Sequence, residues 1–185
     1  MALGSLVHRI KVQISDADRG VYETVDLRLA QHPSETPSYL VTRLLAYCLC
    51  HEEGIAFGHG LSHVDEPAVW IKALDGRLLA WIEVGTPSAE RLHKASKGCA
   101  RVIVFTHHDP RLLQREAQRL PIHRVEHIAV FAPDAALIEA LAGALGRNME
   151  WELVRSGGHL YINVGGQTFE GALTSHTLGG GERDR

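Results

Sequence analysis

Residues 65–88 read DEPAVWIKALDGRLLAWIEVGTPS. Two apolar runs flank Asp75-Gly76, a dipeptide typical of tight hairpin turns. In an antiparallel hairpin with a two-residue turn here, the numbers of paired residues add to 151, so Ala68 faces Glu83. The sequence therefore predicts two paired strands, over residues 67–74 and 78–84.

The same register gathers three carboxylates at the open end of this hairpin. Glu66 faces Gly85, and Asp65 faces Thr86. Strand alternation places Glu66 on the face of Glu83 and Asp65 on the other face. A three-residue loop or a bulge would exchange the two. The spacing thus predicts that one of them joins Glu83 and leaves open which.

The chain on both sides of the hairpin alternates between strand and helix patterns. Apolar residues at helical spacing (Leu40, Leu44, Leu45, Cys48 and Leu49) predict a helix over 37–53, with Gly54 as its C-cap. Thr86-Pro87-Ser88 starts a second helix, over 87–99. Because a helix joins it to strand 78–84, the apolar run 101–106 is predicted to be a parallel strand.

The remaining patterns predict a mixed sheet flanked by helices, an α/β (α+β) fold with an added N-terminal β-hairpin. We expect strands over 5–15, 20–30, 124–131, 149–155 and 159–164, and helices over 110–119 and 133–146. A single domain is expected over 1–174, followed by a disordered tail over 175–185.

Composition limits the class of protein. Hydrophobic residues make up 45% of the chain, which excludes wholesale disorder, and the net charge of −3 excludes a bulk polycation. The longest apolar run, 44–50, is far shorter than the roughly 20 residues of a membrane span. Three cysteines without a C-x-x-C pair and an N-terminus without an apolar signal segment favour the cytoplasm. We expect no membrane association and a monomer or small homo-oligomer.

The three carboxylates precede a helix N-terminus, which favours anions such as phosphate. Arg91 and Lys94 share one face of that helix. Hard oxygen ligands hold Mg²⁺ or Mn²⁺, and such an ion activates water for phosphodiester hydrolysis. The alternative is that these are charges on the solvated end of a hairpin.

Basic residues concentrate between Arg91 and Arg124, where the sequence has eight Lys or Arg and only two Asp or Glu. Arg111, Arg115 and Arg119 recur every four residues and form one stripe on the expected helix, which would suit a nucleic-acid backbone. A solvated helix face is the competing interpretation. His59 and His63 lack the ligand spacing of a closed zinc site, so no structural zinc is predicted.

Five segments in order resemble the bacterial YaeQ family: HPSET (32–36), RLLAY (43–47), DEPAVW (65–70), WIEVGTP (81–87) and RLHKAS (91–96). The resemblance runs from the N-terminus to about residue 164. It implies the PD-(D/E)XK restriction-endonuclease-like core, which consists of a helix, a three-stranded meander, a second helix and a parallel strand. In this chain the first strand of that meander would lie near 55–58.

The resemblance also implies roles for individual residues. Asp65, with Glu66 beside it, and Glu83 correspond to metal ligands of that superfamily. Gly85 stands where the superfamily has lysine, and Lys94 on the following helix is the expected replacement, positioned to orient the attacking water. Arg91 and Lys97 are the expected phosphate contacts, and Glu35 approximates the helix-borne glutamate of the superfamily.

The expected function is therefore a metal-dependent phosphodiesterase or nuclease that uses Mg²⁺ or Mn²⁺ and acts on nucleic acid. The alternative is a non-catalytic module that binds nucleic acid or protein, which the glycine at position 85 favours. A third expectation is hydrolysis of a small phosphorylated substrate, which the acidic net charge favours.

Overall fold

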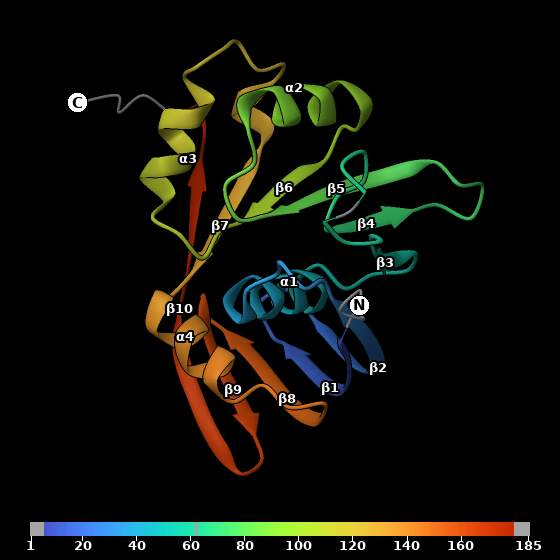
Figure 1. Ribbon diagram of the computed structural model, residues 1–185, viewed down its shortest axis with the longest axis vertical. Coiled ribbons are helices and arrows are strands. Elements are labelled where there is room, and N and C mark those ends of the chain that lie inside the picture. The colour runs from blue at the N-terminus through green and yellow to red at the C-terminus, as the bar shows by residue number, and fades with distance from the viewer. Residues whose placement is uncertain (1–5, 62, 180–185) are drawn as a thin grey trace.

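A buried helix, α1 (Pro37–Leu49), lies at the centre of the molecule, and a ten-stranded sheet curls around it (Figure 1). The computed structural model describes residues 6–61 and 63–179. The strand order is β2-β1-β8-β9-β10-β7-β6-β5-β4-β3. The strands are β1 (Leu6–Asp16), β2 (Val21–Gln31), β3 (Ile55–Phe57), β4 (Val69–Lys72), β5 (Leu78–Val84), β6 (Val102–Phe105), β7 (Ala129–Pro133), β8 (Asn148–Ser156), β9 (His159–Val164) and β10 (Gln167–Thr177). The expected mixed α+β fold with an N-terminal β1–β2 hairpin is confirmed.

Helix α1 is buried on nearly all sides. Nine of its 13 residues are buried, including the whole predicted stripe. A helix of this kind belongs inside a core, and here it packs between the β1–β2–β8–β9 part of the sheet and the β3–β7 part. The predicted end was wrong: the helix stops at Leu49 with Cys50 as its C-cap. Gly54 instead turns the chain into β3 at φ +85°, where a Cβ would lie 1.9 Å from the carbonyl oxygen of Lys72.

The β4–β5 hairpin has the predicted register but a different turn. Val69, Trp70 and Ile71 pair with Ile82, Trp81 and Ala80, and each pair of numbers adds to 151. The turn is one residue longer than predicted, because the amide of Ala73 donates to the carbonyl of Arg77. A bulge beside Ile71 and Lys72 offsets the extra residue. The two departures cancel, so Glu83 keeps its predicted place.

Three further α-helices complete the described fold: α2 (Ala89–Gly98), α3 (Pro110–Ala117) and α4 (Ala135–Gly143). Helices α2 and α3 cover the outer face of β5–β7, and α4 packs beside α1 (Figure 1). Strand β6 is parallel to β5, as predicted. The strand expected over 124–131 begins only at Ala129, because Val125–His127 forms a short 3₁₀ helix.

Strand β10 was missed, although it joins the two halves of the sheet. Its first half, Gln167–Ala172, pairs with β9, and its second half, Leu173–Thr177, pairs with β7. The strand therefore includes residues 175–177 of the expected tail. Residues 180–185 of that tail lie outside the described part of the chain.

Candidate functional site

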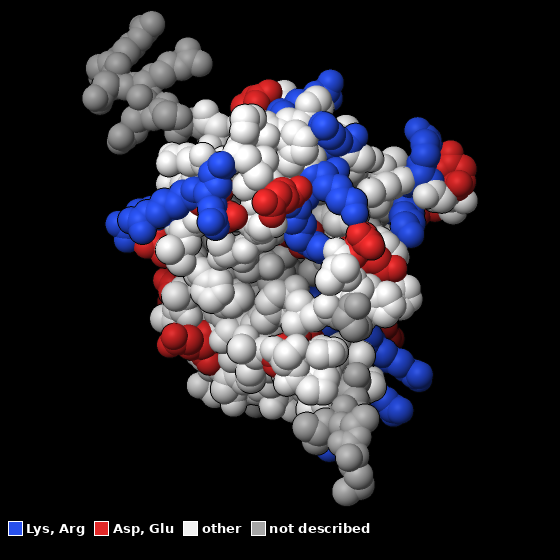
Figure 2. All heavy atoms as spheres, turned by 45° about the horizontal axis from the view of Figure 1, so that its top comes forward, with Lys and Arg blue, Asp and Glu red and all other residues white. Residues whose placement is uncertain are grey.

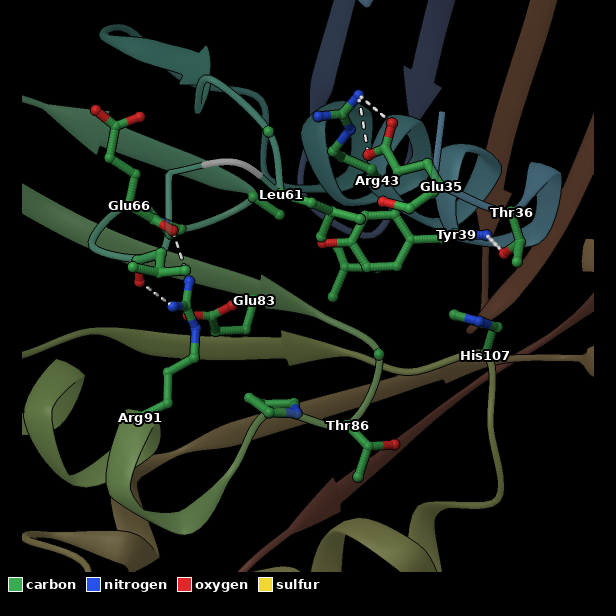
Figure 3. Close-up of a pocket in the computed structure, with 18 of the residues that line it drawn as sticks. Glu35, Thr36, Tyr39, Arg43, Leu61, Glu66, Glu83, Thr86, Arg91 and His107 are labelled. Carbon is green, nitrogen blue, oxygen red and sulfur yellow. Dashed lines mark hydrogen bonds and ion pairs between the residues drawn. The ribbon is translucent and has the colours of Figure 1, made fainter. Parts of the chain in front are cut away.

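A cleft of about 490 Å³ opens where the N-terminal turn of α1 faces the ends of β5 and β6 (Figure 3). Glu35, Tyr39 and Arg43 form the α1 wall. Glu83 and Arg91 belong to the opposite wall, formed by β5 and α2. A short segment between β3 and β4, Val64–Glu66, runs along the rim and is called the strap below.

Glu83 is the buried acid of the β5–α2 wall. Its side chain is 5% exposed, and its Oε1 accepts hydrogen bonds from Arg91 Nε and Trp81 Nε1, each at 2.6 Å. No hydrogen bond from the described residues reaches Oε2. Burial raises the pKa of Glu83, while Arg91 and the two hydrogen bonds oppose that rise. Glu83 therefore keeps one carboxylate oxygen available at a position that lines the cleft.

Arg91 ties this wall to the strap. It lies in the first turn of α2, where its amide donates to the N-cap hydroxyl of Ser88 at 3.2 Å. Its Nη2 donates to the carbonyl oxygen of Glu66 at 2.5 Å, and its Nη1 donates to that of Val64. All three donor nitrogens of the guanidinium are thus engaged, two of them by the strap.

The other predicted residues lie at the rim and do not join Glu83. Asp65 forms an ion pair with Lys94 at 2.6 Å, with side chains 80% and 72% exposed, and the hydrogen bond from Lys94 lowers the pKa of Asp65. The Glu66 carboxylate accepts a hydrogen bond from the main-chain amide of His59 at 3.0 Å and another from the His59 ring at 2.7 Å. Both lower the pKa of Glu66, and the hydrogen bond from the main-chain amide is the larger cause. In Figure 3 the Glu66 side chain points away from Glu83.

Neither the carboxylate of Asp65 nor that of Glu66 is therefore the partner of Glu83. Only the main-chain carbonyl of Glu66 shares a contact with Glu83, through Arg91. Within residues 6–61 and 63–179, no three His, Cys, Asp or Glu side chains are grouped to hold a metal ion. Lys97 lies exposed in the last turn of α2.

The α1 wall holds a second Glu–Arg pair, which is sealed from solvent. Glu35 Oε2 accepts from the amide of His32 at 2.9 Å, and Oε1 lies 3.2 Å from Arg43 Nη2. Arg43 also donates to the carbonyl of Ala30 at 2.6 Å. Burial raises the pKa of Glu35 against the opposing charge of Arg43. The sequence indicated Glu35 but missed Arg43, although it is the one charged residue in α1.

Two aromatic side chains at the cleft were also missed. The rings of Tyr39 and His107 meet edge to face, with centroids 6.3 Å apart. Burial, reinforced by the negative charge of Glu83, raises the pKa of Tyr39 to about 12. Burial, with a smaller contribution from His108, lowers the pKa of His107 to about 4. Both groups are therefore neutral at pH 7. No local sequence pattern predicts their contact, because they meet only through the packing of α1 against the end of β6.

Gly85 has a backbone reason to be glycine. Its φ is +88°, a region that side-chain-bearing residues rarely adopt. The cleft has room for a Cβ, which would lie 3.8 Å from the Tyr39 ring. The strain of the backbone, rather than lack of space, thus disfavours lysine at this position.

Basic side chains on the surface are interspersed with acidic ones (Figure 2). The predicted helix over 110–119 ends at Ala117, so Arg119 lies beyond α3. Arg111 pairs with Asp109 at 2.6 Å, and Arg119 pairs with Glu116 at 3.1 Å. The arginine stripe predicted on this helix is thus partly neutralised by neighbours. None of the described helices is long and apolar enough to cross a membrane.

Comparison with known proteins identifies relatives of the chain. The family model described as YaeQ protein matches residues 1–173. The YaeQ protein of Escherichia coli (strain K12) is 36% identical over 107 residues, or 58% of this chain. That match spans 59% of the length of this curated relative.

Two crystal structures of YaeQ proteins are similar over nearly the whole chain. The protein from Xanthomonas axonopodis pv. citri has a TM-score of 0.86 and 30% identity, covering 94% of this chain and 98% of its own. The protein from Pseudomonas syringae has a TM-score of 0.83 and 35% identity, covering 97% and 98%. These similarities agree with the mixed α+β fold described above.

Proposed function

This chain belongs to the YaeQ family, and we propose that it is a metal-dependent phosphodiesterase that acts on nucleic acid in the cleft. The observation that carries the proposal is Glu83, a buried carboxylate at the end of β5 with one oxygen that accepts no hydrogen bond from the described residues. It lies directly before the N-terminus of α2, where main-chain amides and the helix dipole favour a phosphate group.

The order of elements supports a restriction-endonuclease-like core. Helix α1 precedes an antiparallel meander of β3, β4 and β5, and α2 then leads to β6, which is parallel to β5. This is the order that the sequence resemblance implies for such a core. In that arrangement Arg91 and Lys97 contact phosphate and Lys94 orients the attacking water.

A shared divalent cation fits the three predicted carboxylates poorly in this arrangement. Asp65 is engaged by Lys94 at the exposed rim, and Glu66 is engaged by His59. Glu83 lines the cleft with an oxygen that accepts no hydrogen bond from the described residues, but Mg²⁺ prefers an octahedral set of oxygen ligands. The residues present do not fit one ion as they stand, so the Mg²⁺ or Mn²⁺ requirement is a matter for direct measurement.

Hydrolysis is tested with purified protein on single- and double-stranded DNA and RNA, with Mg²⁺, Mn²⁺ or EDTA. We expect cleavage with either metal and none with EDTA. Glu83→Gln removes the charge at the cleft and lowers the rate by about 10²-fold or more. Glu139→Gln, an exposed acid on α4, is the matched control and keeps the full rate. Cleavage that survives EDTA or Glu83→Gln contradicts the proposal.

Lys94→Met tests the lysine of the proposed site. The substitution keeps the aliphatic length and removes the charge, so kcat falls by about 10²-fold while folding survives. Lys97→Met tests the proposed phosphate contact of Lys97, whose loss raises KM. Comparing the two variants thus separates a role in phosphate binding from a role in orienting the attacking water. Unchanged kcat in Lys94→Met would remove this lysine from the mechanism.

A non-catalytic binding module is the second candidate, and two observations favour it. Gly85 occupies the place of the superfamily lysine in a backbone conformation that disfavours lysine. In addition, each of the three carboxylates already has a basic partner. Such a module binds nucleic acid with steep salt dependence and cleaves nothing under any metal condition.

Replacing the arginine stripe tests nucleic-acid binding for both the phosphodiesterase and the non-catalytic module. Replacing Arg111, Arg115 and Arg119 together with alanine flattens the slope of log affinity against log salt by up to about three units. An unchanged slope means that the stripe is a solvated surface.

A further inference from the structure

Three oxygen atoms from two separate segments converge on the guanidinium of Arg91. They are Oε1 of Glu83 and the main-chain carbonyl oxygens of Glu66 and Val64. The strap supplies the two carbonyls, and β5 supplies the carboxylate. Figure 3 shows the side chain of Arg91 reaching from α2 into the space between these segments.

One carboxylate and two carbonyls form a set of hard oxygen atoms, which is the kind of set that binds Mg²⁺, Mn²⁺ or Ca²⁺. A guanidinium is a permanent cation with donors only, so it satisfies the same oxygens through hydrogen bonds. The helix itself does not favour a cation here. Arg91 lies in the first turn of α2, near the positive end of the helix dipole. The oxygens, rather than the helix, account for its position.

The other predicted site residues surround this point. Asp65 is the middle residue of the strap, between the two residues whose carbonyls Arg91 binds. Lys94 lies one turn beyond Arg91 on α2 and pairs with Asp65. Helix α2 thus holds the strap through two basic side chains, and Arg91 separates Asp65 from Glu83.

We propose that Arg91 is a built-in cation that occupies the place of a divalent ion, so that Arg91 and a divalent metal exclude each other and the metal binds Glu83 only when Arg91 has left it, as the proposed metal-dependent hydrolysis requires. The charges require this exclusion, because Glu83 carries one negative charge and Arg91 already balances it. A divalent ion beside Arg91 would place three positive charges against that single carboxylate. The identity of the ion rests on the proposed function, whereas the convergence of the three oxygens does not.

Mn²⁺ binding to Arg91→Ala tests the exclusion without any assay of hydrolysis. Isothermal titration measures the dissociation constant of Mn²⁺ for the unchanged chain and for the variant. We expect the variant to bind at least about 10-fold more tightly, since it removes a neighbouring positive charge. Bound ion also stabilises the variant, and at 100 times the dissociation constant its Tm rises by about 5–10 °C.

Three further variants make the test specific. Arg91→Ala combined with Glu83→Gln loses the gain in Mn²⁺ affinity, because the only carboxylate of the set is gone. Arg101→Ala removes an ion pair with Glu52 outside the cleft and leaves Mn²⁺ affinity unchanged. Arg91→Met also removes the charge but keeps part of the aliphatic side chain, so it gives a gain of the same sign and replaces Arg91→Ala where that variant does not fold.

The outcomes distinguish this inference from the proposed function. Equal Mn²⁺ affinity in the unchanged chain and in Arg91→Ala overturns the exclusion, and so does a folded variant that binds no Mn²⁺. A gain in Mn²⁺ affinity without hydrolysis of any nucleic acid upholds the exclusion and rejects the phosphodiesterase.

Discussion

The two walls of the cleft carry the same pair of side chains, a glutamate and an arginine, in different surroundings. On the α1 wall, the side chains of Glu35 and Arg43 are 0% and 2% exposed. On the β5–α2 wall, Glu83 is 5% exposed, whereas Arg91 is 28% exposed and also binds the strap. One pair is enclosed by the core, and the other borders solvent.

This difference separates a structural pair from an exchangeable one. When a buried charge loses its partner, no water molecule can take the partner's place. Neither member of a sealed pair can therefore be exchanged for another ligand, and the pair stabilises the fold. At the open pair, an ion, water or phosphate can take the place of either partner. We therefore assign structure to the α1 wall and chemistry to the β5–α2 wall.

Arg43→Met should have the largest effect on stability. It leaves the Glu35 carboxylate buried without its cation, and we expect the free energy of unfolding to fall by about 3–5 kcal/mol in urea denaturation. The double variant Glu35→Gln/Arg43→Met removes both charges and should lose less than Arg43→Met alone. A loss below about 1 kcal/mol in the single variant would show that the pair is not sealed.

Arg91→Met should cost less, about 1–3 kcal/mol, because solvent in the cleft reaches the carboxylate of Glu83 after the arginine is gone. The same denaturation experiment measures it beside Arg43→Met. A loss equal to or larger than that of Arg43→Met would erase the distinction between the two walls.

The pH dependence of stability sharpens the comparison at the boundary between the walls, where His107 meets Tyr39. The unfolded chain protonates this imidazole near pH 6.5, and the folded chain does so only near pH 4. Protonation therefore favours unfolding. The stability that His107 contributes is complete above pH 6.5 and is lost as the pH falls from about 6.5 to about 4.

Because His107 is partly exposed, we expect this loss to be about 1–2 kcal/mol, less than the full shift would give. His107→Gln should remove it, so the difference in unfolding free energy between the two proteins changes with pH in this window only. An NMR titration in which the His107 ring protonates near pH 6.5 would contradict the burial of this side chain.

Asp65→Asn should have the smallest effect. The Asp65–Lys94 pair is exposed on both sides, and such pairs contribute little to stability. We expect Tm to stay within about 2 °C of that of the unchanged chain in a thermal scan. A larger drop in Tm would mean that the Asp65–Lys94 pair holds the strap in place and contributes to stability.

Local sequence patterns predicted the elements around the cleft because they determine hairpins, helix starts and buried strands. The Asp75-Gly76 turn located Glu83 correctly even though the loop and the bulge differ from the prediction. Strand β10 was missed because Gln167–Thr177 has only three apolar residues, Phe169, Ala172 and Leu173, and its pairing with both β9 and β7 depends on distant partners.

The site was predicted less completely than the fold. Spacing along the chain predicted that Asp65 or Glu66 joins Glu83, but it does not report that Lys94 and His59 engage these two carboxylates instead. Arg43 reaches back from α1 to Glu35, which precedes the helix, and His107 reaches Tyr39 from the loop after β6. These contacts arise only when α1 is enclosed by the sheet.

A crystal of Arg91→Ala soaked in Mn²⁺ tests the central claim most directly, through the anomalous scattering of the ion. The account predicts one Mn²⁺ bound by Glu83 and by the carbonyl oxygens of Val64 and Glu66, and, in the unchanged chain, no ion there while Arg91 holds Glu83. Mn²⁺ beside Glu83 in the unchanged chain, with Arg91 still in place, would contradict it.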